Sequence, residues 1–166
     1  MIATQARPGS RAPRRGARLQ VASIVGTSLA LLLAPSVLAL GATTTRGDFQ
    51  AFATGIGLPI TGRAQMIRTP DGKTIVSVHV EGLVPNTAYP SHVHQLPCGT
   101  SDADGHYKND PAGPAAPPNE IWQGFTTNDA GVGNGNAIVD WTAGATAVSV
   151  VVHAPGGAKI ACADLS

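Results

Sequence analysis

The sequence predicts an all-β domain: an antiparallel Greek-key β-barrel or sandwich of about eight short strands with one disulfide. Gly and Pro supply 20 and 13 of the 166 residues, and neither suits the interior of a helix. Val, Ile and Thr, which favour strands, are common. From residue 62 onward, short strand-like segments alternate with turn residues, and no helical pattern follows residue 41. A chain of this length suits one domain.

The clearest element is a hairpin formed by residues 63–68 and 73–81. Asp71-Gly72 between the two segments is a strong tight-turn signal. In the second segment valines alternate with polar residues, so one face is expected to be buried and the other exposed. We therefore expect His79 to face solvent. Further strands are expected at 89–94, 121–127, 137–141, 147–153 and 159–165, with a long loop over 95–119.

Residues 1–42 are expected to be a targeting segment. An arginine-rich stretch precedes an apolar run over residues 21–40, and V-L-A at Val37–Ala39 suits a signal peptidase. The run is also long enough, at about 20 residues, to tether the protein to a membrane. A cleaved signal peptide and a retained anchor both remain open, and either makes the protein exported: periplasmic, extracellular or held at the outer face of the membrane.

Residues 43–61 are expected to be a small, polar spacer that can end in a first strand near Phe49–Ala53, and residues 62–166 are expected to form the barrel. Outside the N-terminal arginines the charge is acidic. Residues 47–166 carry five basic and ten acidic side chains, a net charge of −5. Because nucleic-acid binders usually show a basic patch, no nucleic-acid partner is expected.

The chain has two cysteines, Cys98 and Cys162, separated by 64 residues. An even count in an exported chain predicts a single disulfide. Closing a loop of this length stabilises a fold by about 4 kcal/mol in the chain-entropy model.

Four of the five histidines are candidate metal ligands. His92 and His94 are two residues apart on an expected strand, so both rings point to one side, as copper or zinc requires. Such a pair alone is weak evidence. His106 in the loop and His153 at a strand end are, taken singly, ordinary surface positions. Trp122, Phe125 and Trp141 are expected to serve packing rather than binding.

Several motifs recur in the order found in one family: H-V-H-x-x-x-C at His92–Cys98, G-H-Y at 105–107, V-V-H at 151–153 and A-C-A-D-L at 161–165. V-E-G-L-x-P-N at 80–86 precedes them. The chain thereby resembles the Cu/Zn superoxide dismutases over residues 62–165.

The resemblance implies copper ligands at His92, His94 and His153. It places His106 at the position that bridges copper and zinc, and it pairs Cys98 with Cys162. It also places Lys159 at the position of the arginine that guides superoxide to copper.

Two departures from the family concern zinc. No histidine lies between His106 and His153, where the family has further zinc ligands, and only eight residues separate His153 from Cys162. One imidazole with carboxylates is a poor closed zinc site, so zinc is not expected. The chain resembles the copper-only branch of the family. A carboxylate would then have to orient His106 in place of zinc, and Glu120 or Asp110 is the candidate, with Glu120 preferred because it adjoins a strand.

The resemblance therefore implies copper-dependent dismutation of superoxide to oxygen and hydrogen peroxide. In that reaction His106 would carry a proton and Lys159 would attract the anion. The alternative from another class is a non-catalytic copper-binding or storage module on the same fold, since one fold hosts many functions. A purely structural sandwich would leave the four-histidine pattern without a purpose.

Overall fold

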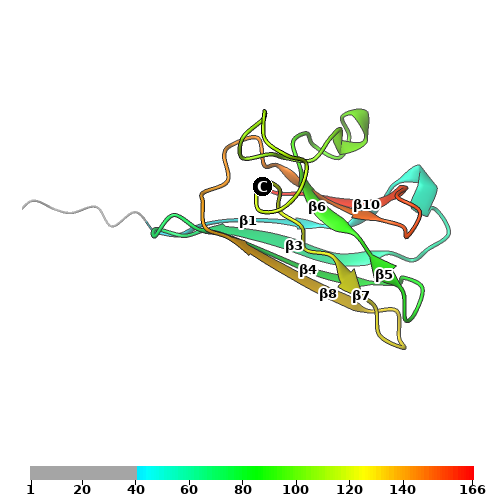
Figure 1. Ribbon diagram of the computed structural model, residues 1–166. Coiled ribbons are helices and arrows are strands. Elements are labelled where there is room, and N and C mark those ends of the chain that lie inside the picture. The colour runs from blue at the N-terminus through cyan, green and yellow to red at the C-terminus, as the bar shows by residue number, and fades with distance from the viewer. Residues whose placement is uncertain (1–40) are drawn as a thin grey trace, which may run out of the picture. The chain divides into compact units, whose positions relative to one another are not determined.

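The computed structural model describes residues 41–166, which form two four-stranded antiparallel sheets and a two-stranded one (Figure 1). Residues 1–40 of the expected targeting segment, including the possible membrane tether at 21–40, lie outside the described residues. Across residues 41–166 there is no helix with the length and apolar character needed to cross a bilayer. The predicted all-β class is confirmed, because the helical elements there are two single 3-10 turns, Ala53–Gly55 and Ser101–Ala103.

The first sheet has the order β1-β3-β4-β8 and the second β2-β10-β9-β6, while β5 pairs with β7. The bounds are β1 Thr43–Asp48, β2 Gln50–Ala51, β3 Thr61–Arg68, β4 Thr74–Glu81, β5 Ala88–Tyr89, β6 Ser91–His94, β7 Phe125–Thr126, β8 Gly133–Val139, β9 Ser149–His153 and β10 Lys159–Asp164. The pairs β4–β8 and β6–β9 join strands that are not consecutive, as in a Greek key rather than a meander.

The predicted hairpin is the β3–β4 pair, in register from Thr61–Glu81 to Arg68–Thr74. Its turn needs a positive φ, which Gly72 supplies at 85°. The valines of β4 are buried and the alternating polar residues are exposed, as predicted. His79 lies on the exposed face, where its Nδ1 is 2.8 Å from Asn134 Oδ1 and its Nε2 is 2.9 Å from Glu81 Oε1.

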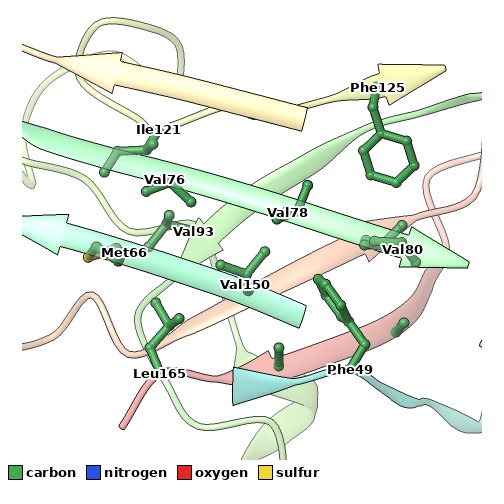
Figure 2. Close-up of a cluster of buried hydrophobic side chains, with 14 of the residues drawn as sticks. Phe49, Met66, Val76, Val78, Val80, Val93, Ile121, Phe125, Val150 and Leu165 are labelled. Atoms are coloured by element: carbon green, nitrogen blue, oxygen red, sulfur yellow. The ribbon is translucent and has the colours of Figure 1, made fainter. Parts of the chain in front are cut away.

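The core lies between the two large sheets. Figure 2 shows Met66, Val76, Val78 and Val80 of the first sheet facing Val93 and Val150 of the second, with Phe49, Ile121, Phe125 and Leu165 filling the ends. β9 differs from β4 because all five of its residues are buried. Its outer side is therefore covered as well.

The cover on the outer side of β9 is the long loop that follows β6. Ala103 of this loop packs with Val151 and Cys162 in a second, small apolar cluster. The disulfide Cys98–Cys162 is formed, with an S–S distance of 2.01 Å, and it ties the loop to β10. The space between the loop and the second sheet is where the histidines lie.

Three strand expectations need correction. Residues 43–61 contribute β1 and β2, so strand structure begins at Thr43 instead of near Phe49. β1 is an edge strand of small and polar residues, held by backbone pairing to β3, and it leaves no alternating pattern to detect. β8 begins at Gly133, four residues before the expected start, and only Phe125–Thr126 of the expected strand 121–127 pairs as a strand. In the rest of that segment, Trp122 forms an isolated bridge with His92.

Candidate metal centre

Three of the candidate histidines lie on the outer face of the second sheet. In β6 the side chain of Val93 enters the core, so those of His92 and His94 point the other way. In the paired strand β9, Val150 and Val152 enter the core and His153 points outward. Alternation along two neighbouring strands thus brings three imidazoles to one place.

The fourth histidine comes from the loop. His106 forms an isolated antiparallel bridge with His94, and Tyr107 N donates to Val93 O at 2.8 Å. These backbone contacts dock the loop beside β6. The rings are close, with centroid separations of 4.1 Å for His92–His106 and 5.0 Å for both His92–His153 and His94–His106.

One nitrogen of each of the four rings lies within 4.8 Å of the corresponding nitrogens of the others. Buried ring nitrogens without any hydrogen-bond partner are His92 Nδ1, His94 Nε2 and His153 Nε2. An unpaired buried polar atom is costly. Three of them converging on one point is the arrangement expected of metal ligands.

Hydrogen bonds on the opposite side of the rings set the tautomers. His94 Nδ1 is 3.0 Å from Asp104 O, and His153 Nδ1 is 3.0 Å from Gly157 O. A carbonyl oxygen only accepts, so each Nδ1 carries the hydrogen and each Nε2 keeps its lone pair for a metal. Partners of this kind usually fix the orientation of metal-binding histidines.

The site favours neutral imidazoles. Burial lowers the pKa of His92 to about 3 and that of His94 to about 3, and the neighbouring histidines add to the effect. Burial also lowers the pKa of His153, to which the charges of His106 and Lys159 contribute. A metal therefore meets ligands that need not lose a proton at neutral pH.

The carboxylate in contact with His106 is that of Glu120. Glu120 Oε2 lies 2.7 Å from His106 Nδ1, and the residue is only 2% exposed. The carboxylate accepts, so His106 also keeps the lone pair of Nε2 on the side of the cluster. Asp110 is placed elsewhere: it is exposed, and its Oδ1 accepts from Ala112 N in a turn.

Trp122 belongs to the site, although its sequence context suggested only packing. Its indole Nε1 donates to Glu120 Oε2 at 2.7 Å, and its ring centroid lies 5.0 Å from that of His92. The sequence pattern that could have indicated this role is that Glu120 and Trp122 lie two residues apart, as His92 and His94 do. Sequence alone did not show that the two segments lie side by side.

Lys159 lies at the edge of the site, and its ammonium group is engaged by backbone. Nζ donates to Asp102 O and Asp104 O, both at 2.7 Å. Residues 101–104 all have positive φ, between 47° and 64°, a conformation that non-glycine residues rarely adopt. Asp104 O accepts from both Lys159 and His94, so the lysine holds the backbone that orients a candidate ligand.

A cavity of about 540 Å³ borders the other side of His106 and Glu120. Its remaining lining is Gln95, Gly105, Tyr107, Lys108, Pro111, Ala115 and Thr146, which contribute no further histidine or carboxylate. Within residues 41–166 the only other group of potential ligand atoms is Cys98, Cys162 and Asp164, whose sulfurs are joined in the disulfide. The four histidines are thus the candidate metal-binding cluster of the described residues.

Comparison with known proteins places the fold. No family model matches the sequence, and no curated protein matches it. Among solved structures, a mutant of superoxide dismutase 5 from Candida albicans aligns with a TM-score of 0.54 at 17% identity, covering 76% of this chain and 92% of that chain. The described domain therefore has a superoxide dismutase-like fold, and it carries a four-histidine cluster that could hold a metal.

Proposed function

We propose that this protein is an exported copper-dependent superoxide dismutase that works without zinc. The observation that carries the proposal is the convergence of four imidazoles, three of them with a buried and unpartnered ring nitrogen, on one point of a superoxide dismutase-like fold. The ordered motifs around His92, Cys98 and His153 add support. Export is consistent with the disulfide, because disulfides persist mainly outside the cytoplasm.

Copper fits the donor set better than other divalent ions. Imidazole nitrogens suit both copper and zinc, and Cu²⁺ binds a given nitrogen site more tightly than Zn²⁺. His92 Nδ1, His94 Nε2, His153 Nε2 and His106 Nε2 would hold it. Bound there, copper would supply a one-electron couple that oxidises one superoxide to oxygen and reduces a second to peroxide.

The residues of the chain have separate tasks in this proposal. Among the four clustered histidines, His106 is the one in contact with a carboxylate, and its side chain is 29% exposed, so it is the ring placed to pass a proton between solvent and the site. Lys159 keeps a positive charge beside the cluster in a domain that is acidic overall, and this charge draws an anion inward.

The zinc-less proposal rests on the cavity behind His106. A closed zinc site takes four ligands in a tetrahedral arrangement. His106 and Glu120 are the potential ligands that line this cavity, and the ammonium-bearing Lys108 lines it too. Glu120 therefore takes over the task of orienting His106.

The test is superoxide decay by pulse radiolysis of the purified protein loaded with copper alone, with zinc excluded by chelation. Catalytic decay is expected, and His153→Ala should abolish it. His79→Ala is the matched control, because His79 lies on the exposed face of the other sheet. The control should keep the full rate.

Decay no faster than with the copper-free protein, once a chelator has removed unbound copper from both samples, would contradict the enzyme proposal. If copper still bound at one ion per chain, the protein would be a non-catalytic copper-binding module. Full activity only after addition of zinc would contradict the zinc-less part of the proposal.

A further inference from the structure

Trp122 occupies an unusual position for a large apolar side chain. It is 43% exposed, yet its polar atom and its ring both face the candidate metal centre. A ring left this open adds little burial to the core. Its placement has to be explained by what it contacts.

Backbone pairing directs this side chain to the site. Val93 N donates to Ile121 O and Gln123 N donates to Ser91 O, so Trp122 is the cross-strand partner of His92. Partners directly opposite in an antiparallel pair point to the same side. Glu120, two residues earlier, shares that side, and it lies opposite Lys108 in a second isolated bridge.

One carboxylate oxygen receives both donors. Glu120 Oε2 is 2.7 Å from His106 Nδ1 and 2.7 Å from Trp122 Nε1. A single hydrogen bond would leave a carboxylate free to rotate about its terminal torsion, which is broad. A second, charge-assisted donor at the same oxygen removes that freedom. The orientation of Glu120, and through it that of His106, then depends on the indole.

The ring of Trp122 acts on a second histidine. Its plane is tilted by 58° to the ring of His92 at 5.0 Å, and it meets the ring of His106 edge-on at 86° and 6.4 Å. Both are ordinary separations for paired aromatic rings. The indole therefore forms one wall of the cluster and limits rotation of the two histidines.

The geometry points to Trp122 as a positioning residue of the metal centre, which acts through Glu120 on His106 and directly on the ring of His92. The role of the metal rests on the proposed function. The positioning role concerns copper binding and does not require dismutation.

The experiment measures copper affinity by competition with a chelator, together with the Cu²⁺ electron paramagnetic resonance spectrum. Trp122→Phe keeps a ring and removes the N–H donor. We expect it to weaken copper binding about tenfold, within the range usual for partners of metal ligands, and to change the hyperfine splitting. The matched control is Trp141→Phe, since Trp141 packs on Tyr107 and donates to Pro118 O, and it should leave both readouts unchanged.

A double-mutant cycle with Glu120→Gln tests the route of the effect. If the indole acts through Glu120, the double variant should bind copper within about twofold of Glu120→Gln alone. Losses that multiply would show that the indole and the carboxylate act independently, and this would overturn the route through Glu120. Wild-type affinity and spectrum in Trp122→Phe would overturn the role of the N–H donor, and the same result in Trp122→Ala would overturn the positioning role altogether.

Fluorescence keeps the inference testable should Trp122→Phe fail to fold. The chain has two tryptophans, so Trp141→Phe leaves Trp122 as the sole tryptophan, whose emission is selected by excitation beyond the tyrosine absorption band. One equivalent of Cu²⁺ should quench it strongly, and Glu120→Gln should shift its emission in the metal-free protein. Trp122 emission that changes neither on addition of Cu²⁺ nor in the Glu120→Gln variant would overturn the inference. A protein that shows these copper effects but does not dismute superoxide would refute the proposed function and leave the positioning role standing.

Discussion

Acid should destabilise the metal-free domain, and the candidate ligands set the size of the effect. Burial holds the pKa of His92 and His94 at about 3, against an ordinary value of 6.5. Between these two pH values the unfolded chain binds protons that the folded chain excludes. The stabilising contribution of neutral His92 and His94 is therefore present above pH 6.5 and is lost as the pH falls towards 3.

Each of these histidines changes the free energy of unfolding by about 1.4 kcal/mol per pH unit once the pH is well below 6.5. From pH 7.5 to pH 5 the loss is about 2 kcal/mol for each and about 4 kcal/mol for the pair. This is a large share of the total stability of a domain, which is typically about 5–15 kcal/mol.

Urea denaturation of the chelator-treated protein at pH 7.5, 6 and 5 measures this loss. His92→Gln should remove about 2 kcal/mol of the pH dependence, while His153, whose pKa burial also lowers, adds a contribution of the same sign. His79→Gln is the control, since hydrogen bonding to Asn134 and Glu81 raises the pKa of His79 and makes its small contribution opposite in sign. A free energy of unfolding that stays constant between pH 7.5 and 5 would refute the assignment of the pair as neutral, buried ligands.

Three further predictions concern charge, the disulfide and the core. Lys159→Glu should slow the reaction with superoxide by about tenfold and make the rate rise with salt, whereas Lys159→Arg should retain most of the wild-type rate. Stopped-flow kinetics at two ionic strengths measure both variants, and an unchanged rate in Lys159→Glu would exclude electrostatic steering by this residue. Replacing Cys98 and Cys162 with alanine should lower the free energy of unfolding by about 4 kcal/mol. It should also weaken copper binding, because the loop carrying His106 is then no longer joined to β10. Denaturation curves that match those of the wild type would contradict the predicted loss of stability. Met66→Ala, at a fully buried position between the sheets, should lower the free energy of unfolding by about 2–5 kcal/mol. The folded variant should still bind one copper ion per chain, which metal analysis checks. Loss of copper from the folded variant would show that the core and the site are coupled.

Local patterns in the sequence were sufficient for the β3–β4 hairpin and for the pairing of His92 with His94. A turn at Asp71-Gly72 and alternation along one strand depend on neighbours in the chain, and such signals survive without any knowledge of the fold. The same rule explains why the exposure of His79 was predictable.

Edge strands escaped prediction for the converse reason. β1 has mostly exposed, small and polar residues, and its strand conformation comes from six backbone pairs with β3. Hydrogen bonds between backbone groups do not depend on side-chain type, so they leave no pattern in the sequence that would predict the strand. The early start of β8 at Gly133 has the same cause, since glycine and asparagine alternate there against β4.

Within the candidate site, the residue types were predictable and their contacts were not. The sequence by itself determined that four histidines, two cysteines and a lysine occur in an order resembling one family. Only the tertiary structure decided that Glu120, and not Asp110, meets His106, and that Trp122 meets both Glu120 and His92. These contacts join residues on separate segments, so they depend on how the loop docks on the second sheet, which the packing of Ala103 and the disulfide fix in space.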